Sequence, residues 1–328
     1  MIIEVRESSQ TGEIRRRTLE LAEALHLGEK RGGAAALAAT EMATNLLKHA
    51  GSGNMLLQRV QQNGSSGLRL IAVDKGPGIA DITRALEDGH STAGTNGNGL
   101  GAIRRVSDVF EVYSDSAAGT LIRAEFWSDK SRATEGSLEI AAVSEPLQGE
   151  EECGDGWGSR KFADSHVLMI VDGLGHGVLA AEAAREAEQV LARAQADSPQ
   201  EILQDIHGAL KKTRGAAVAV AKIQPEKGLL TFVGVGNISA SIVSAGTSRS
   251  MASHNGTVGH LMARVQEFTC PWNPESHFIM HSDGLGSRWD LERYPGILSK
   301  HPSLIATILH RDFSRGRDDV TVLVAKTL

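Results

Sequence analysis

Acidic residues beside glycines or other acids recur four times in the second half of the chain. They stand in CGDGW (Asp155), IVDGLGHG (Asp172), HSDGLGSRW (Asp283) and GRDDVTVL (Asp318 and Asp319). Carboxylates without His or Cys ligands suit hard cations such as Mg²⁺ or Mn²⁺. Two such ions can hold a water, lower its pKa and aim it at a phosphoryl group. Asp-Gly is also ordinary turn chemistry, so each motif taken alone leaves a plain turn open.

A helical motif in the first half offers a second kind of chemistry. EMATNLLKH places Glu41, Asn45 and His49 four residues apart, on one face of a predicted helix. An acidic base four residues from an amide ligand could orient an attacking group beside a phosphate-bound Mg²⁺. A solvated helix face is the alternative for these three residues.

Two glycine-rich motifs follow in the same half. In VDKGPGI, Asp74 ends a predicted strand, so its carboxylate could accept from an exocyclic amine while Gly76 and Gly78 turn the backbone away. The second motif is GTNGNGLG, with Gly94, Thr95, Gly97, Gly99, Leu100 and Gly101. Such a loop could bring backbone N–H groups onto phosphates at the start of the next helix. A simple turn and a flexible lid are the alternatives.

The elements that position these motifs follow from apolar spacing. In the first half we predict helices over 13–26, 33–49 and 99–108 and strands over 55–62, 68–74, 110–114 and 119–127. In the second half we predict helices over 177–196, 199–213 and 302–313 and strands over 138–146, 165–172, 216–223, 229–236, 239–245, 277–283 and 319–326. The fold class is therefore α+β: helices over a mostly antiparallel sheet, then a β-sandwich covered by helices.

Length and composition limit the number of domains and the class of protein. The chain has 328 residues, which favours two domains, placed at 1–130 and 138–328 with a polar linker at 131–137. The net charge of −6 argues against the strongly basic face of a nucleic-acid binder, and two cysteines exclude a disulfide framework. The charged N-terminus lacks the apolar region of a signal peptide, and no apolar run approaches the ~20 residues that span a bilayer. We expect a cytoplasmic protein with no nucleic-acid or membrane partner.

The three motifs of the first half, in their order and spacing, resemble the N box and two glycine boxes of the GHKL ATPase superfamily. The closest likeness is to the small anti-sigma or switch serine kinases of the RsbT and RsbW type, and it covers about 35–127. It implies a Bergerat α/β sandwich that binds ATP with Mg²⁺. Glu41 would be the general base and Asn45 the Mg²⁺ ligand. Asp74 would bind the adenine amine, with Thr120 nearby.

The second half, from about 139 to 326, resembles the PPM superfamily of protein phosphatases in its SpoIIE/RsbX branch. The matching segments are VDGLGHG, TRGAAVAV, HSDGL and RGRDDVTVLV. The resemblance implies an αββα sandwich with two Mn²⁺ or Mg²⁺ ions. The implied ligands are Asp155, Asp172, the carbonyl of Gly173, Asp283 and Asp318. The sequence does not decide between Asp318 and Asp319; we favour Asp318 because it precedes a position where many relatives have Asn.

Two further residues of this half have open roles. His176, just past the Asp172 turn, could donate a proton to the leaving group or cap the following helix. Arg214, in TRG before a predicted strand, could touch phosphate or be a surface arginine. The N-terminal arginine motif that eukaryotic relatives use for phosphate is not visible in this sequence.

Together the two resemblances imply opposed chemistry on one chain. One half would phosphorylate Ser or Thr of a STAS-domain protein and the other would remove the phosphate, as in partner-switching or stressosome pathways. The alternative is an ATP-controlled binding switch that sequesters a partner, such as a sigma factor or downstream activator, without kinase turnover. A homodimer is compatible with the resemblance, since RsbW-type relatives dimerise and RsbT-type ones need not.

Overall fold

The computed structural model describes residues 1–62, 64–87, 99–129, 137–244, 247–262 and 265–328. Two units make up the chain: Met1–Gly136 with Arg293–Lys300, and Ser137–Glu292 with His301–Leu328. Of the proposed linker 131–137, only Ser137 lies within the described ranges. No helix in these ranges has both the length and the apolar character needed to cross a membrane.

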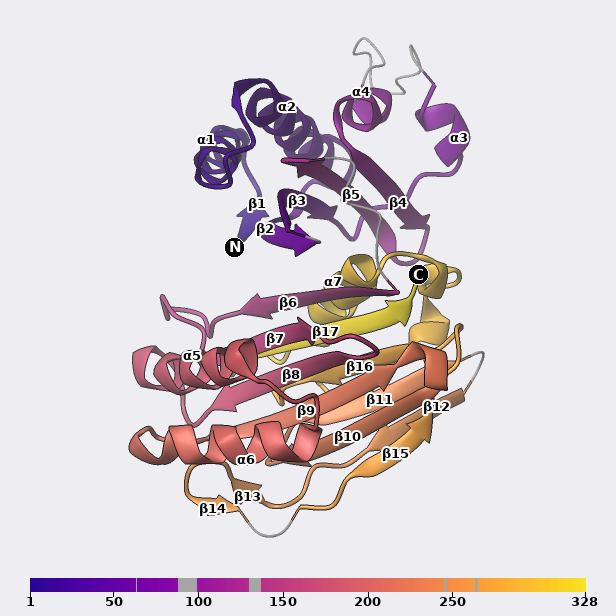
Figure 1. The fold of residues 1–328 in the computed structure, drawn as a ribbon. Helices are drawn as coiled ribbons and strands as arrows, with labels where there is room; N and C mark the ends of the chain where they lie inside the picture. The colour runs from indigo at the N-terminus through magenta and orange to yellow at the C-terminus, as the bar shows by residue number, and fades with distance from the viewer. Residues whose placement is uncertain (63, 88–98, 130–136, 245–246, 263–264) are drawn as a thin grey trace. The chain divides into compact units, whose positions relative to one another are not determined.

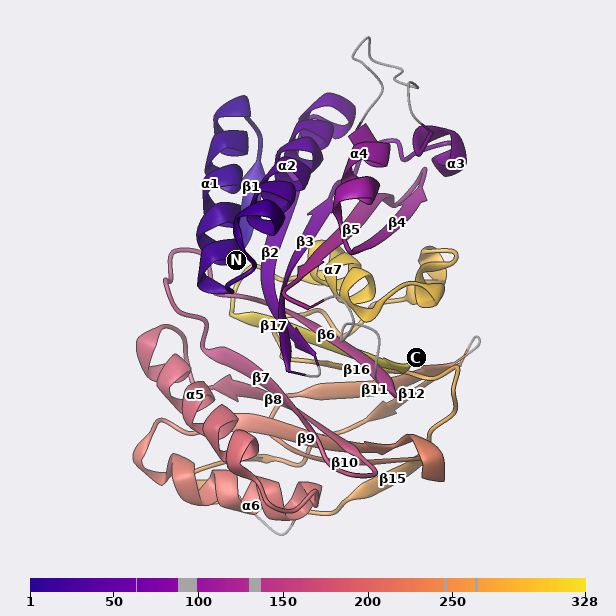
Figure 2. The same ribbon diagram turned by 45° about the horizontal axis from the view of Figure 1, so that its top comes forward.

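One antiparallel five-stranded sheet, in the order β1-β2-β3-β5-β4, forms the base of the first unit. Its strands are β1 (Ile2–Val5), β2 (Gly53–Gln62), β3 (Ser65–Val73), β4 (Val109–Asp115) and β5 (Gly119–Trp127). The helices are α1 (Ser8–Ala24), α2 (Glu29–Asn45), α3 (Ile82–Ala85) and α4 (Gly99–Val106), and a π-helix (Leu46–Ala50) continues α2. Figures 1 and 2 show α1, α2 and α4 on one face of the sheet, so this unit is an α/β sandwich.

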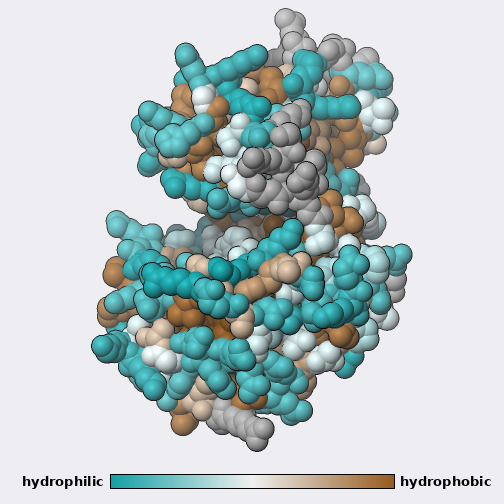
Figure 3. Space-filling model, viewed as in Figure 1, coloured by the Kyte–Doolittle hydropathy of each residue, from teal (hydrophilic) through white to brown (hydrophobic). Residues whose placement is uncertain are grey.

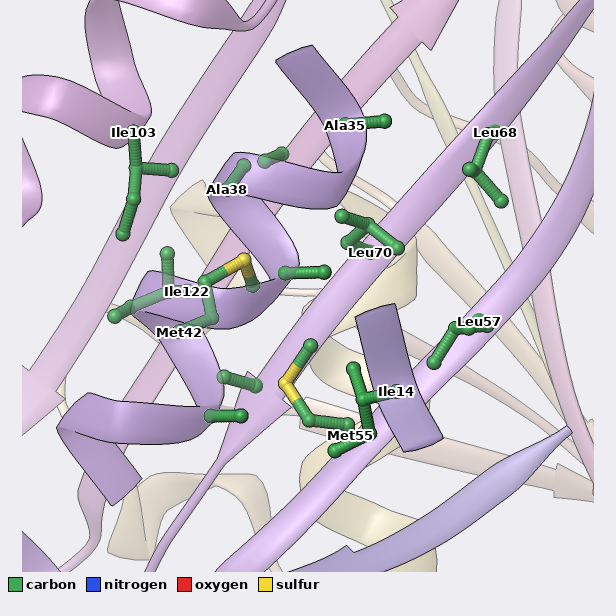
Figure 4. Close-up of a cluster of buried hydrophobic side chains, with 14 of the residues drawn as sticks. Ile14, Ala35, Ala38, Met42, Met55, Leu57, Leu68, Leu70, Ile103 and Ile122 are labelled. Carbon is green, nitrogen blue, oxygen red and sulfur yellow. The ribbon is translucent and has the colours of Figure 1, made fainter. Parts of the chain in front are cut away.

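The core of the first unit lies between these helices and the sheet. Met42 of α2 and Ile14 of α1 are buried with Met55 of β2 and Leu70 of β3 (Figure 4). Strand alternation aims one set of side chains at the helices, and each large side chain buried there contributes about 1.5–3 kcal/mol. Small residues let the helices approach closely, since a Cβ at Gly32 of α2 would lie 3.4 Å from the Cβ of Ala22.

The predicted strands of this unit are confirmed, with ends shifted by a few residues. The four-residue β1 was not predicted, because so short a run shows no clear alternation. The predicted helix over 33–49 is corrected: the α-helix begins at Glu29 and ends at Asn45, and the last turn is π-helical. The predicted helix over 13–26 begins earlier, at Ser8, where Glu7 and Gln10 form a capping box.

The second unit contains two five-stranded sheets. The first has the order β15 (Phe268–Pro271), β10 (Leu229–Val235), β9 (Ala216–Gln224), β8 (His166–Gly173) and β7 (Asp155–Lys161). The second has the order β12 (Thr247–Met251), β11 (Ser239–Ser244), β16 (His277–His281), β17 (Val320–Thr327) and β6 (Leu138–Glu145). A short pair, β13 (Gly256–Thr257) and β14 (Leu261–Met262), stands apart.

Helices cover both outer faces, which gives the predicted αββα order of layers (Figure 2). The helices α5 (Val178–Arg193) and α6 (Pro199–Ala209) pack on the first sheet, and α7 (Pro302–Phe313) packs on the second. Short 3₁₀ turns cover Leu210–Lys212, Pro225–Lys227, Leu291–Arg293 and Ile297–Ser299. On the face shown in Figure 3, hydrophilic residues cover most of the surface, as expected when apolar side chains fill interior cores.

Alternate residues of β8 supply two of the apolar layers of this unit. Ile170 of β8 faces the second sheet, where Phe278 and Leu323 join the same core. Met169, the preceding residue, instead packs with Ala187 of α5. A strand buried on both faces reads as a continuous apolar run, and VLMIV of β8 is such a run.

The major strands and helices predicted for this half are confirmed, including the edge strand β6, but three other edge strands were missed. β7, β12 and β15 lie at sheet edges, where polar and charged residues occupy exposed positions. Sequences such as DGWGSRK lack the apolar alternation that identifies a strand. The strand β7 matters for function, because it begins at Asp155.

Candidate active sites

In the first unit, Asp74 is bonded to the strand beside it. It directly follows β3, and its Oδ1 accepts from the backbone N–H of Gly76 at 2.8 Å and of Thr120 at 3.1 Å. Its own N–H donates to the Thr120 carbonyl at 3.0 Å. The structure therefore places Thr120 beside Asp74, as the resemblance to the GHKL ATPases implied.

Glycines line the same place because side chains do not fit. Gly78 has φ +74°, and a Cβ there would lie 2.7 Å from the Asp115 carbonyl oxygen. Gly119 has φ +82°, and its Cβ would lie 2.3 Å from the Asp74 carbonyl oxygen. At Gly76 a Cβ would lie 2.9 Å from that of Ala50. The backbone at Gly76 and the backbone at Gly119 thus both lie close to Asp74.

Ser114 is a residue of this site that the sequence reasoning missed. Its Oγ accepts from the Ile79 N–H at 2.7 Å and lies 2.9 Å from the Thr120 hydroxyl. It therefore joins the DxGPG turn to the ends of β4 and β5. A lone serine at a strand end carries no signal that distinguishes it from any other.

The helical and glycine-rich motifs meet at the start of α4. Asn45 is the last residue of α2, and a Cβ at Gly99 would lie 3.5 Å from both its Oδ1 and its Nδ2. Glu41 lies one turn earlier in α2 and is half-buried. The N-terminus of α4, whose first N–H groups have no acceptor within the helix itself, begins against the Asn45 side chain, which suits phosphate binding.

The remaining predicted residues of this site have different positions. Leu100 packs against the core and Gly101 is buried, so both residues help to hold α4 against the core. Gly94, Thr95 and Gly97 lie outside the described residues. His49 lies on the π-helix and is exposed, so its predicted α-helical spacing from Asn45 is wrong. A π turn has a wider spacing than an α turn, and single π turns are frequent at functional sites.

In the second unit, strand pairing gathers the acidic residues at one end of the sandwich. Asp155 of β7 is paired directly with Asp172 of β8. Asp283 follows the end of β16, and Asp318 and Asp319 precede the start of β17. Because β16 and β17 run antiparallel, with His281 opposite Val322, these ends are adjacent. We call these five aspartates the acidic site.

Ser282 links the two sheets at the acidic site and was also missed. Its fully buried hydroxyl donates to Asp155 Oδ2 at 2.6 Å and accepts from the Thr321 N–H at 2.9 Å. It thereby holds the first sheet's aspartate against the second sheet. The signal available in the sequence was its place immediately before Asp283.

The structure distinguishes Asp318 from Asp319. Asp319 is only 3% exposed, and its Oδ1 accepts from the Leu147 N–H at 2.8 Å. Its Oδ2 is buried without a hydrogen-bond partner, 2.6 Å from where a Cβ on Gly154 would lie. Asp318 is exposed, and its Oδ1 accepts from the Asp319 N–H at 2.9 Å. Asp319 is thus held in the interior, whereas Asp318 is open to a ligand.

The electrostatics of the acidic site indicate a need for positive charge. Burial, together with the neighbouring carboxylates, raises the pKa of Asp155 to about 7 and that of Asp172 to about 8. Burial and the charges of Asp283 and Asp319 also raise the pKa of Asp318. Like charges disfavour one another's ionised form, and a bound cation removes this cost.

The donor set fits Mg²⁺ or Mn²⁺, since every predicted side-chain ligand is a carboxylate and the orphaned Asp319 oxygen adds another nearby. Within the described ranges, no three His, Cys, Asp or Glu side chains already form a ready-made metal cage. The carboxylates are nevertheless close enough for Asp155 and Asp172 to have their pKa values raised by their acidic neighbours. The carbonyl of Gly173, at the end of β8, lies in the same turn as Asp172.

His176 does not cap the helix that follows it. The N-cap of α5 is Gly177, and no side-chain hydrogen bond caps it. The imidazole Nδ1 instead lies 2.5 Å from Oε1 of Glu150, and the side chain is 54% exposed. Glu150, a partner that the sequence did not suggest, therefore fixes the ring and leaves Nε2 available.

Comparison with known proteins finds similar proteins for each half of the chain. Residues 163–328 match the family described as Stage II sporulation protein E (SpoIIE), and residues 5–126 match the histidine kinase-like ATPase domain. The serine/threonine-protein kinase RsbT of Bacillus subtilis (strain 168) is 42% identical over 90 residues, which are 27% of this chain and 68% of RsbT. The phosphoserine phosphatase RsbX of the same organism is 27% identical over 139 residues, 42% of this chain and 70% of RsbX.

Among solved structures, one described as "The bacterial stressosome: a modular system that has been adapted to control secondary messenger signaling" matches with a TM-score of 0.55 and 26% identity. The match covers 58% of this chain and all of that one. The phosphatase-like fold and the kinase-like domain are thus each supported from the sequence and the structure. The chain belongs to the SpoIIE family through residues 163–328, and carries an RsbT-like histidine kinase-like ATPase domain ahead of it.

Proposed function

We propose that this protein is a bifunctional regulator of a partner-switching system. Its second unit removes phosphate from serine or threonine of a STAS-domain protein, and its first unit binds ATP with Mg²⁺ and phosphorylates such a protein. The observation that carries the phosphatase part is the acidic site, where strand ends bring five aspartates together and the pKa values of Asp155, Asp172 and Asp318 are raised. The similarity to RsbX and RsbT supports the choice of substrate class.

In the phosphatase unit, Asp155, Asp172, the Gly173 carbonyl, Asp283 and Asp318 would hold two divalent cations. When bound, such cations supply an activated water and neutralise the phosphoryl charge. Ser282 keeps Asp155 in position through its 2.6 Å hydrogen bond. His176, held at Nδ1 by Glu150, would donate a proton from Nε2 to the leaving serine oxygen.

In the kinase-like unit, Asp74 would bind the adenine amine, and the turn of Gly76 and Gly78 leaves room for the ring. Asn45, beside the start of α4, would hold the nucleotide's Mg²⁺. Glu41, one turn earlier on the same helix, would accept the proton of the attacking serine hydroxyl. The proposed role of Asn45 depends on the close approach of α2 and α4 observed around Gly99.

The test uses a STAS-domain protein encoded beside this gene. It is incubated with Mg²⁺-ATP and either the wild type or Asp172→Asn, and its phosphorylation is read by intact mass. Phosphate accumulating only with the variant would establish both activities on one substrate. If neither protein yields phosphate, the first unit is no kinase for that partner. If pre-phosphorylated substrate is dephosphorylated equally by both proteins, the acidic site is not the phosphatase centre.

The ATP-controlled binding switch remains a distinct outcome of the same design. A partner that co-purifies with the protein, and stays bound to Glu41→Ala in the presence of ATP, would support sequestration without turnover. A Glu41→Ala protein that still phosphorylates the STAS-domain protein at the wild-type rate would exclude Glu41 as the base. Measuring binding and phosphorylation on the same samples separates the two roles.

A further inference from the structure

Arg214 is fixed against the loop that follows Asp172. It lies between the 3₁₀ turn Leu210–Lys212 and β9. The N–H of Gly215 donates to the Thr213 hydroxyl at 3.0 Å, and the carbonyl of Gly215 accepts from the Leu174 N–H at 3.0 Å. These bonds hold the backbone on both sides of Arg214, so its side chain starts from a defined place beside the acidic site.

Gly175 makes room for the guanidinium. A Cβ on Gly175 would lie 3.2 Å from Nη1 of Arg214, and Gly175 has φ +85°. The guanidinium therefore lies over the backbone between Gly173 and His176. The carbonyl of Gly173 is a proposed ligand to the metal cations, and His176 is the proposed proton donor. The positive charge of the Arg214 guanidinium therefore lies at the edge of the proposed phosphatase site.

Within the described residues, no ion pair neutralises the charge of Arg214. In the described part of the chain, no carboxylate lies within ion-pair distance of it, and the residue is exposed. Arg185 of α5, by contrast, pairs with Glu152. A guanidinium that is held by its backbone, yet paired with no acid, has its planar set of donors available to an outside anion.

We propose that Arg214 binds the phosphate group of the phosphoserine or phosphothreonine substrate. This inference rests on the phosphatase function proposed above. Carboxylates repel a phosphate dianion, so positive charge beyond that of bound cations would help to hold it. A guanidinium matches two phosphate oxygens with two parallel N–H donors.

The test compares Arg214→Ala, Arg214→Lys and a control, Arg193→Ala. Arg193 is an exposed arginine at the end of α5, about 22 Å along the helix from its first turn. The probe is inorganic phosphate, measured as an inhibitor of p-nitrophenyl phosphate hydrolysis with Mn²⁺ and by direct titration into the Mn²⁺-loaded protein. We expect Arg214→Ala to weaken phosphate binding about tenfold or more. Arg214→Lys should lose less, and Arg193→Ala should match the wild type.

Two further readouts keep the inference falsifiable. The Tm and the Mn²⁺ affinity, from titration with the metal alone, should stay unchanged in Arg214→Ala. Unchanged phosphate binding in that variant overturns the proposal, and so does a loss that is matched by weaker Mn²⁺ binding. If the wild type hydrolyses no phosphate ester but Arg214→Ala still weakens phosphate binding, the phosphatase function fails while the anion site stands.

Discussion

At the scale of single residues, the acidic site is shaped by charge that its surroundings do not neutralise. Asp155 and Asp172 face each other across β7 and β8, and one is almost fully buried. Water cannot solvate these carboxylates well, and each opposes the ionisation of the others. Protons or divalent cations must therefore compensate the charge, and at neutral pH the two compete.

This competition predicts how the metal-free protein responds to pH. The folded-state pKa values of Asp155 and Asp172, about 7 and about 8, lie above the ordinary value of 3.8. Between about pH 4 and pH 8 the folded state therefore holds more protons than the unfolded state. The free energy of unfolding falls as the pH rises through this range. We expect the Tm in chelator to fall over this range, and to fall less for Asp172→Asn. Identical pH profiles for the two proteins would contradict this account.

Substitution by Asn should have different effects on hydrolysis at the neighbouring residues Asp318 and Asp319. Asp319→Asn keeps the oxygen that accepts from the Leu147 N–H and removes a buried charge. We expect it to retain Mn²⁺-dependent hydrolysis of p-nitrophenyl phosphate within a few-fold, with an unchanged or higher Tm. Asp318→Asn should lose hydrolysis by a factor of about 100 or more if this carboxylate is a metal ligand, as a lost ligand would weaken the activated water. The reverse ranking would make Asp319 the ligand.

At the scale of elements, both sites form where strand ends meet a tight backbone. The end of β3, the start of β5 and the turn after Asp74 approach so closely that only glycine fits at several positions. The acidic site also has a position where only glycine fits, since a Cβ at Gly284 would lie 2.0 Å from the Asp319 carbonyl oxygen. These glycines are demanded by contact with backbone atoms, which cannot move aside as a flexible side chain can.

A pair of glycine substitutions tests this reading in the first unit. Gly119→Ala places a Cβ 2.3 Å from the Asp74 carbonyl at a positive φ, so we expect a lower Tm and at least tenfold weaker ATP binding. Gly33→Ala is the control, because Gly33 lies exposed inside α2 with nothing within 4 Å of its Cβ position. Alanine there should stabilise the helix by roughly 0.5–1 kcal/mol. Calorimetric titration with Mg²⁺-ATP and thermal melting measure both effects; equal ATP binding by the two variants would argue against the Asp74 site.

At the scale of the whole molecule, the chain combines two units with separate apolar cores. Helices and sheet enclose an apolar core in the first unit, and apolar side chains fill the space between the αββα layers in the second. A ligand that binds only the folded state of one unit stabilises that unit by mass action. Each unit should therefore report its own ligand.

Separate ligand responses follow from this organisation. We expect Mg²⁺-ATP and Mn²⁺ each to raise a melting transition. Asp172→Asn should lose most of the Mn²⁺ effect and keep the ATP effect, whereas Gly119→Ala should do the opposite. Differential scanning calorimetry with a non-hydrolysable ATP analogue avoids turnover. Loss of both ligand effects in either variant would show that the sites are not assigned to separate units.

The sequence predicted most of the buried framework and the residue types of both sites. VLMIV in β8 and the alanine-rich face of α2 are continuous patterns, and local spacing is enough to read them. Edge strands such as β7 escaped, because their polar residues face solvent and interrupt the apolar alternation that identifies a strand. The π turn at Leu46–Ala50 also escaped, since helix periodicity does not distinguish it from a last α turn.

The sequence by itself determined that Asp74 ends a strand beside glycines and that five aspartates stand next to strands, because these are local patterns. Only the tertiary structure decided which residues meet: Thr120 with Asp74, Ser282 with Asp155, and Glu150 with His176. It also buried Asp319, left Asp318 exposed and laid Arg214 over Gly175. Such contacts depend on strand register and layer packing across tens to more than a hundred residues, and no local spacing encodes them.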